Sequence, residues 1–550
     1  MPTRREFLAV SAAPFTAPAA EKPPNVVLIM TDDHGFGDLS CHGNDRLNTP
    51  NLDRIAREGV EFTQFHVSPV CAPTRSSLMT GRYNYRTGAI DTYLGRAMMH
   101  SDEVTLPEVL AQAGYRTGIF GKWHLGDNYP MRPIDQGFRE AVNHLGGGIA
   151  QPSDLPGGSS YFDPVVMHNG RIQQYKGYCT DVFTNEALRF MEENRSRPFF
   201  AYLAPNAPHT PLQVDEKYVA PFRSNGLDET TAKVYGMVAN IDENVGRLLG
   251  RLNTLGLAEN TIVIFMTDNG PQQRRYNAGM RGLKGTVYEG GIRVPFFIRW
   301  PKVLKPGRKV DRLAAHIDVL PTVLDACGVP RMSGIPLDGR SLMPLLRDEK
   351  THWPDRTISV QWHRGDEPEM YRACMTRNQR WKLVDGKEMY DLQYDPAEKE
   401  DVSSRYPEIA ARLRKSYEEW FRDVSSTRGY QPPRIYLGTK FENPVTLSRQ
   451  DWRGPKAGWN ADSLGYWEVD VREAGAYDIT FRFAARPSPG TARFRLGALS
   501  FDSEKPLAAG STWCEFRKVA LPRGHGRLEA ILSFGRAEAG ANYVDVRRVE

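Results

Sequence analysis

A single cysteine begins the stretch of the chain with the clearest chemical potential. Cys71 is followed by Pro73 and Arg75 within residues 68–82, where we predict a helix that begins at the cysteine. No second cysteine lies nearby in the sequence to form a disulfide or a zinc site. An unpaired cysteine is most often a buried apolar side chain. The alternative is a precursor that is oxidised after synthesis to a catalytic group, and the other polar residues have to distinguish the two.

Two pairs of oxygen-donating side chains form the next group: Asp32 with Asp33, and Asp268 with Asn269. Carboxylate and amide oxygens are hard ligands that suit Ca²⁺ or Mg²⁺. Such residues can instead cap helices, and either pair alone fits that role equally well. Two adjacent carboxylates repel each other without a cation, so two such pairs at equivalent positions favour a metal site.

Cationic and proton-transferring side chains form the third group. Lys122, His124, His209 and Lys284 occur in loops bounded by glycine or proline, and Arg75 lies in the helix predicted to begin at Cys71. Taken singly, such residues are usually solvated or capping groups. Together with a metal ion they describe a pocket for a tetrahedral oxyanion, and a sulfate or phosphate ester is the substrate that this chemistry predicts.

Uninterrupted apolar runs precede most of these polar residues, at 25–30, 115–120, 198–203 and 261–266. Such runs are typical of parallel strands covered on both faces. Helical patterns lie between them, at 51–59, 106–114 and 235–255. Ligands bind at the carboxyl ends of strands in open α/β sheets, so we expect the polar residues to meet there. The Gly- and Pro-rich residues 146–164 are predicted to form a long loop that shapes the site.

The length of 550 residues and the change of pattern along the chain predict several domains. We expect an α/β catalytic domain over residues 21–350 and a small α+β subdomain over 351–430, with a helix at 407–421. Runs with a period of two then predict an antiparallel β-sandwich over 431–550.

Four tryptophans enrich the predicted β-sandwich: Trp452, Trp459, Trp467 and Trp513. They could form a face that stacks on carbohydrate. Tryptophan is also a normal residue of a sandwich core, and core packing is the interpretation that we favour.

Residues 1–20 resemble a twin-arginine export signal. Arg4 and Arg5 precede Phe7 and Leu8, an apolar run follows, and residues 17–19 offer an Ala-x-Ala cleavage site. The run is too short and too rich in alanine to span a bilayer. We therefore expect export in a folded state to a bacterial periplasm or beyond, and an ordinary frayed N-terminus is the alternative.

Charge and cysteine usage exclude several other classes of protein. The net charge is +5, from 71 basic and 66 acidic residues, and no long basic run marks a nucleic-acid-binding surface. The six cysteines are widely spaced, which is typical neither of a disulfide scaffold nor of a zinc site. Disulfide pairing and oligomeric state are not set by the sequence.

Six ordered motifs make the chain resemble the type I, formylglycine-dependent sulfatases of the alkaline-phosphatase superfamily, over residues 24–404. The motifs are Thr31-Asp32-Asp33-His34-Gly35, Cys71-Ala72-Pro73-Thr74-Arg75, Gly121-Lys122-Trp123-His124, Pro208-His209-Thr210-Pro211, Thr267-Asp268-Asn269-Gly270 and Lys284-Gly285-Thr286. The resemblance implies an α/β fold in which a mixed sheet is flanked by helices. Pro271 departs from many relatives, and we expect the polar residues 272–275 to affect substrate choice.

The resemblance also implies a role for each candidate residue. A maturation enzyme would convert Cys71 to formylglycine, and Ca²⁺ would be held by that residue with Asp32, Asp33, Asp268 and Asn269. The aldehyde hydrate would be held by Arg75, and the sulfate oxygens by Lys122 and Lys284. The leaving alcohol would be protonated by His209, and His124 would assist the release of sulfate.

Sulfuric ester hydrolysis is therefore the predicted reaction, on a sulfated polysaccharide or oligosaccharide, with an aryl sulfate as an alternative. A phosphatase or phosphodiesterase of the same superfamily is the second hypothesis. It is disfavoured because those relatives typically use serine or threonine with two zinc ions. A carbohydrate-binding protein without activity is disfavoured because every predicted catalytic position is intact. We expect neither a nucleic-acid partner nor a transmembrane segment.

Overall fold

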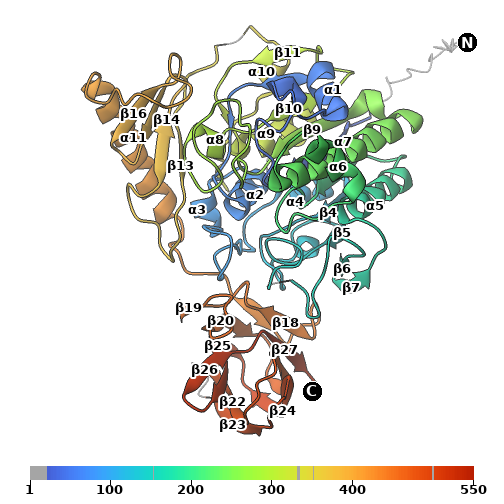
Figure 1. Ribbon diagram of the computed structural model, residues 1–550, viewed down its shortest axis with the longest axis vertical. Helices are drawn as coiled ribbons and strands as arrows, with labels where there is room; N and C mark the ends of the chain where they lie inside the picture. The colour runs from blue at the N-terminus through green and yellow to red at the C-terminus, as the bar shows by residue number, and fades with distance from the viewer. Residues whose placement is uncertain (1–21, 153, 331–334, 351, 498–500, 550) are drawn as a thin grey trace, which may run out of the picture.

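The structure is a computed structural model that describes residues 22–152, 154–330, 335–350, 352–497 and 501–549 (Figure 1). The export signal predicted over residues 1–20 lies outside these residues. Among the described helices, none has the length and apolar character needed to cross a membrane.

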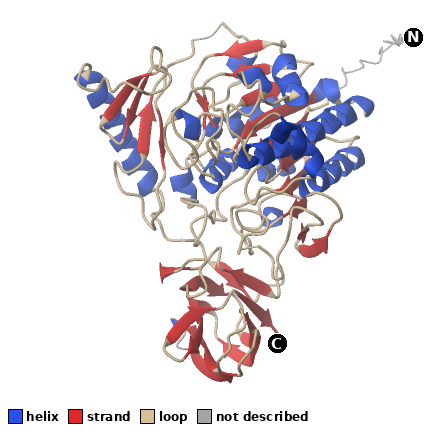
Figure 2. Ribbon diagram, viewed as in Figure 1, coloured by secondary structure: helices blue, strands red, loops and turns tan. Residues whose placement is uncertain are grey.

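A ten-stranded mixed sheet lies at the centre of the larger lobe, in the order β11-β2-β10-β9-β1-β8-β4-β5-β6-β7 (Figure 2). Its parallel centre consists of β9 (Thr261–Thr267), β1 (Asn25–Thr31), β8 (Phe199–Ala204), β4 (Arg116–Gly121) and β5 (Glu140–Asn143). The outer strands are β10 (Phe296–Arg299), β2 (Val60–Phe62), β11 (Arg308–Val310), β6 (Val165–His168) and β7 (Arg171–Gln174). The mixed α/β sheet predicted from the sequence is confirmed, with β1, β4, β8 and β9 at the four apolar runs.

Both faces of the sheet are covered by helices because side chains alternate along each strand. On β1, Val26, Leu28 and Met30 pack on one side with helices α2 (Cys71–Thr80), α4 (Leu106–Gln112) and α9 (Val319–Ala326). Val27 and Ile29 pack on the other side with α1 (Pro50–Glu58), α5 (Cys179–Glu193) and α7 (Glu229–Thr254). Shorter elements complete the lobe: β3 (Phe65–His66), α3 (Asn84–Thr87), α6 (Glu216–Ser224), α8 (Glu289–Ile292), β12 (Ala314–Ala315) and α10 (Met343–Leu346).

The start of the long helix differs from the prediction. The apolar pattern placed the start of the long helix at residue 235, but α7 begins at Glu229. Asp228 caps it, since its side chain accepts a hydrogen bond from the Thr231 N–H. The first turn is polar and set by this cap, so the apolar period alone does not reveal it.

A small α+β unit packs beside the large sheet, as Figure 1 shows. Its four antiparallel strands are β13 (Ile358–Gln361), β14 (Cys374–Arg377), β15 (Trp381–Val384) and β16 (Glu388–Asp391). Helix α11 (Pro407–Ser426) packs on β14 and β15. It extends five residues beyond the predicted end at 421.

The C-terminal residues form two packed, mostly antiparallel sheets. One contains β17 (Ile435–Leu437), β19 (Arg453–Lys456), β20 (Leu464–Val471), β22 (Gly490–Leu496), β23 (Phe501–Leu507), β25 (Gly524–Phe534) and β26 (Ala537–Gly540). The other contains β18 (Val445–Ser448), β21 (Gly475–Arg482), β24 (Trp513–Leu521) and β27 (Tyr543–Arg548). Trp452 and Trp467 are fully buried between them, whereas Trp513 is 60% exposed. The four tryptophans therefore do not form one stacking face.

Candidate active site

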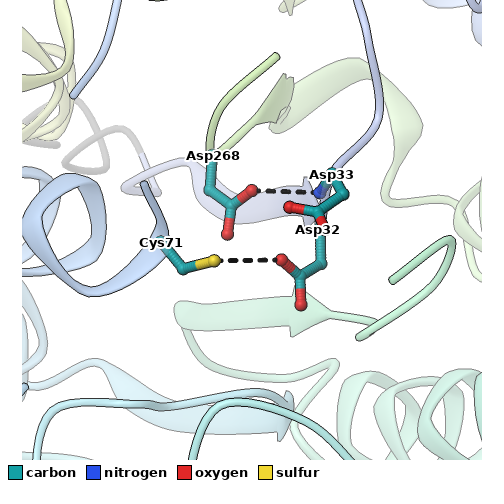
Figure 3. Close-up of side chains that lie close together, drawn as sticks. All are labelled: Asp32, Asp33, Cys71 and Asp268. Atoms are coloured by element: carbon teal, nitrogen blue, oxygen red, sulfur yellow. Dashed lines mark hydrogen bonds between the residues drawn. The ribbon is translucent and has the colours of Figure 1, made fainter. Parts of the chain in front are cut away.

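The acidic residues of the site emerge where two neighbouring strands end. β1 and β9 are parallel and in register, with Thr31 opposite Thr267, so Asp32, Asp33 and Asp268 leave the sheet at the same edge. Ligand atoms of these three residues and Cys71 lie within 4.8 Å of one another, and all four residues are buried (Figure 3). The Asp33 N–H donates to Asp268 Oδ1 over 3.2 Å.

Helix α2 holds Cys71 at its first position. Its thiol donates to Asp32 Oδ1, with the sulfur 3.4 Å from the oxygen (Figure 3). Arg75 lies one turn later on the same face of the helix. Its guanidinium donates to Asp268 Oδ2 at 2.8 and 3.2 Å and to the Lys122 carbonyl at 3.0 Å. These bonds fix α2 against the ends of β9 and β4.

The two predicted lysines each pair with a carboxylate of the cluster. Lys122 Nζ is 2.7 Å from Asp32 Oδ2, and Lys284 Nζ is 2.5 Å from Asp33 Oδ1. Burial alone would raise the pKa of Asp33, but Lys284 and His209 hold it well below its usual range. The pKa of Lys284 is raised, since the attraction of Asp33 outweighs burial. Both members of this pair are therefore charged at neutral pH.

Each of the two histidines is held by a hydrogen bond to a backbone carbonyl, but through a different ring nitrogen. His209 Nδ1 donates to the Thr210 carbonyl at 2.6 Å, and its Nε2 lies 3.8 Å from Asp33 Oδ2. His124 Nε2 donates to the Thr92 carbonyl at 2.7 Å. Burial lowers the pKa of His209 to about 4 and that of His124 well below its ordinary value. Both rings are neutral at pH 7.

The oxygen ligands fit a hard divalent cation such as Ca²⁺. Asp33 Oδ2 and Asn269 Oδ1 are buried and have no hydrogen-bond partner among the described residues. Burial and the neighbouring Asp32 carboxylate raise the pKa of Asp268 to about 6. The cluster thus combines unused oxygen atoms with mutually repelling carboxylates, and a bound cation would stabilise both.

The thiol of Cys71 is a weak nucleophile in this setting. Burial and the nearby Asp32 carboxylate raise its pKa well above the usual value. Only the thiolate attacks or ligates effectively, so the encoded side chain is poorly suited to direct catalysis.

A cavity of about 340 Å³ opens above the cluster. The predicted residues Cys71, His124, His209 and Lys284 line it, whereas Arg75, Lys122 and the carboxylates are buried beneath. Of the polar residues 272–275, Gln272 lines the cavity, but Arg275 instead donates to Asp38 Oδ2 at 2.6 Å in the interior. Gly147 and Gln151, which also line the cavity, belong to the loop 146–164 that was predicted to shape the site. Other lining residues were not predicted as part of the site: Thr92, Tyr93, Trp362, Arg364 and Trp459.

Gly147 is needed where its loop passes His124, one of the predicted catalytic residues. A β-carbon at this position would lie 2.9 Å from His124 Cε1. The glycine-rich segment after residue 145 was predicted only as a loop near the site. The run of glycines was the only sequence signal for this close approach, because glycine often marks a point where the backbone contacts another group.

Comparison with known proteins agrees with this arrangement. Residues 24–329, more than half of the chain, match the family model described as Sulfatase. The chain belongs to the sulfatase family. Residues 283–423 also match the model described as N-sulphoglucosamine sulphohydrolase, C-terminal. The resemblance predicted from the six motifs is confirmed, and the chain is an enzyme that hydrolyses sulfate esters.

Similarity to individual sulfatases covers 60–74% of this chain. N-acetylgalactosamine-6-sulfatase of Canis lupus familiaris is 33% identical over 395 residues, 66% of this chain and 72% of the relative. Arylsulfatase A of Homo sapiens is 34% identical over 362 residues, 60% of this chain and 68% of the relative. The crystal structure of Ps i-CgsB in complex with k-i-k-neocarrahexaose has a TM-score of 0.68 and 29% identity, and the match covers 74% of this chain and 95% of that one. Neither family model extends past residue 423 into the β-sandwich.

Proposed function

We propose that this sulfatase removes sulfate from a sulfated oligosaccharide or polysaccharide, with Cys71 converted to formylglycine by a maturation enzyme. The position of Cys71 carries the proposal. Its sulfur is 3.4 Å from Asp32 at the edge of the carboxylate cluster, and it lines the same cavity as Lys284 and His209. The raised pKa of the thiol supports a modified nucleophile. The carbohydrate class is supported by the sugar sulfatases among its relatives and by the oligosaccharide bound to Ps i-CgsB.

The oxygen ligands would hold Ca²⁺: Asp32, Asp33, Asp268, Asn269 and the modified Cys71. When bound, the ion would polarise a sulfate oxygen and favour the ionised form of a hydroxyl beside it. Asn269 is oriented for this role because its amide Nδ2 donates to Asp33 Oδ1 at 2.8 Å and to the Gly270 carbonyl. Its Oδ1 is thereby left for a ligand.

The cationic side chains have separate tasks. Lys122 and Lys284 neutralise the charge of the sulfate group, since each can exchange part of its interaction with Asp32 or Asp33 for a sulfate oxygen. Arg75 keeps its bonds to Asp268, so its contacts support a role in positioning α2 and Cys71.

Formylglycine hydrate supplies two hydroxyls on one carbon, which allows sulfate to be accepted through one and released as the other re-forms the carbonyl. His209 is assigned to protonate the departing alcohol. His124 is assigned to take the proton that leaves during sulfate release, through Nδ1, which has no partner among the described residues. The negative charge of a bound sulfate ester would favour the protonated form of His209.

We also propose the division into residues 21–350, 351–430 and 431–550, and twin-arginine export to the periplasm or beyond. The second proposal rests on Arg4, Arg5 and the apolar residues that follow them.

The test is Cys71→Ala in protein produced together with a formylglycine-forming enzyme. We expect the variant to lose at least about 1,000-fold of kcat/KM on sulfate esters while its melting temperature stays unchanged, because the nucleophile alone is removed. Mass spectrometry of the wild-type peptide that contains residue 71 should detect the aldehyde. Nearly full activity of Cys71→Ala, or an unmodified thiol in fully active wild type, would contradict the proposal.

A further inference from the structure

One wall of the active-site cavity comes from the β-sandwich. Trp459 lies in the loop between β19 and β20 and lines the same cavity as Cys71 and His209. Its ring meets Tyr93 of the catalytic lobe edge to face, with centroids 5.2 Å apart and planes at 72°. The sandwich therefore reaches the catalytic centre.

A second wall comes from the small α+β unit, just after β13. Trp362 Nε1 donates to Asp91 Oδ1 at 2.9 Å, and Arg364 Nη1 donates to the same oxygen at 2.6 Å. Asp91 is fully buried and anchors both side chains. The Arg364 guanidinium lies over the Tyr93 ring, with its central carbon 4.4 Å from the centroid. Half of the Arg364 side chain is exposed, and its guanidinium donates hydrogen bonds to other described residues through Nη1 alone.

The sandwich wall is held firmly against the catalytic lobe. Gln450 Nε2 donates to the Thr92 carbonyl at 2.9 Å, and the Gly95 N–H donates to the Gln450 carbonyl at 2.9 Å. The sandwich core is also continuous with apolar side chains of the catalytic lobe: Leu94, Met98 and Met131. The Thr92 carbonyl that accepts from Gln450 also accepts from His124. One short segment thus links the sandwich to a catalytic side chain.

We infer that Trp459, Trp362 and Tyr93 form a subsite for the sugar ring of the substrate, and that Arg364 binds a second anionic group on that glycan. The inference rests on the proposed function and adds the substrate class: a glycan with a further sulfate or carboxylate near the ester that is cleaved. Flat aromatic faces match the C–H face of a pyranose ring. A guanidinium with unused donors suits a sulfate or carboxylate. At about 340 Å³ the cavity is near the lower end of the ~300–1,000 Å³ range of ligand pockets, which suits one or two sugar units.

The subsite is tested with Trp459→Ala in full-length, matured enzyme. Truncating the sandwich is less suitable, because it would expose Leu94, Met98 and Met131. The probes are N-acetylgalactosamine 6-sulfate, carrageenan and heparin oligosaccharides, 4-nitrophenyl sulfate, and inorganic sulfate as a competitive inhibitor. We expect kcat/KM on the best sugar substrate to fall about 10- to 100-fold, mainly through KM. The inhibition constant of inorganic sulfate should stay within about 2-fold of wild type, because sulfate alone does not reach the aromatic walls.

Matched variants separate stacking from misfolding. Trp459→Phe should keep most of the activity, and Trp513→Ala should match wild type because Trp513 is 60% exposed on β24, outside the cavity lining. Sugar hydrolysis by Trp459→Ala within about 2-fold of wild type would overturn the subsite, and so would a parallel loss of inorganic sulfate binding. If matured wild type releases sulfate from none of the sugars, the proposed function fails instead.

Arg364→Gln tests the second anionic group. We expect a loss of about 10-fold or more on disulfated sugars or on sulfated sugars that carry a carboxylate, and a change below about 2-fold on monosulfated neutral sugars. Comparison of the disulfated and carboxylate-bearing probes identifies which anion is bound. An equal effect on all probes would overturn the assignment of Arg364.

Discussion

The two histidines of the site are distinguished by which ring nitrogen the chain holds. A backbone carbonyl accepts from Nδ1 of His209 and from Nε2 of His124. The free nitrogens are therefore Nε2 of His209, on the side of Asp33, and Nδ1 of His124. Two neutral imidazoles fixed as opposite tautomers can serve different proton transfers in one cavity.

His209→Ala should reveal its assigned task through the leaving group. We expect kcat to fall about 100-fold or more for alkyl and sugar sulfates, whose alcohols need a proton as they depart, and less than about 10-fold for activated aryl sulfates. A series of aryl sulfates of increasing phenol pKa measures this, since the dependence on leaving-group pKa should become steeper. His525→Ala, an exposed histidine on β25, is the control. Equal losses on good and poor leaving groups would rule out the acid role.

The sequence predicted the residues near the strand ends better than those on the cavity walls. Asp32 and Asp268 each follow an uninterrupted apolar run, so local pattern and strand pairing suffice to bring them together. Trp362 and Trp459 reach the cavity because separate units pack against the catalytic lobe. That packing is long-range, and no periodicity along the chain encodes it.

At the scale of elements, the central strands were predictable and the edge strands were not. β1 and β9 are fully buried and read as continuous apolar segments. β7, with the sequence Arg-Ile-Gln-Gln, is exposed at all four positions and carries no strand pattern. It forms by pairing with β6, so its conformation depends on a neighbour rather than on its own residues.

A buried ionic cluster joins the catalytic lobe to the small α+β unit. Glu289, at the start of α8, accepts from Lys382 Nζ at 3.0 Å, and its carboxylate lies 3.1 Å from His66 Nε2 and 3.3 Å from Arg377 Nη1. The Glu289 N–H donates to Glu398 Oε2 at 2.7 Å. Burial opposes ionisation of Glu289, but Lys382, His66 and Arg377 hold its pKa well below the usual range.

Glu289→Gln should weaken the docking of these elements. Removal of one buried carboxylate leaves the Lys382 and Arg377 charges undercompensated, and we expect a loss of about 3–5 kcal/mol in the free energy of unfolding. Thermal and urea unfolding measure the effect. Glu419→Gln is the matched control, because Glu419 is exposed and its contact with Lys415 spans 3.8 Å. A Glu289→Gln melting temperature equal to that of wild type would contradict this account of the cluster.

At the scale of the whole molecule, three units surround one cavity. The catalytic lobe supplies the floor, and the α+β unit and the β-sandwich supply walls through Trp362 and Trp459. Figure 1 shows the sandwich against one end of the larger lobe, in the region where β18 and β20 approach it. The relative position of the units therefore sets the shape of the cavity. A change at their interface is expected to weaken sugar binding more than it weakens sulfate binding.

A buried carboxyl group makes this interface sensitive to pH. Asp451 of the sandwich is 2% exposed, and burial raises its pKa to about 7. Asp451 in turn raises the pKa of Asp127 in the catalytic lobe, where burial is the larger cause. The folded protein therefore keeps a proton on Asp451 that the unfolded chain, with a pKa of about 3.9, releases.

The sign of the effect follows from proton binding. Between about pH 4 and pH 7 the folded state binds more protons at Asp451 than the unfolded state, so stability falls as pH rises, by roughly 1.4 kcal/mol per pH unit from this group. Asp451→Asn removes the titration of this group and the part of the raised pKa of Asp127 that Asp451 causes, while the part caused by burial remains. Its melting temperature should therefore fall less steeply with rising pH than that of wild type, lying above wild type at pH 8 and approaching it at pH 5. Calorimetry at pH 5, 6, 7 and 8 measures the difference, with the exposed Asp462→Asn as the control. If Asp451→Asn and wild type lose stability in parallel as pH rises, the interface carboxyl is not the source of the pH dependence.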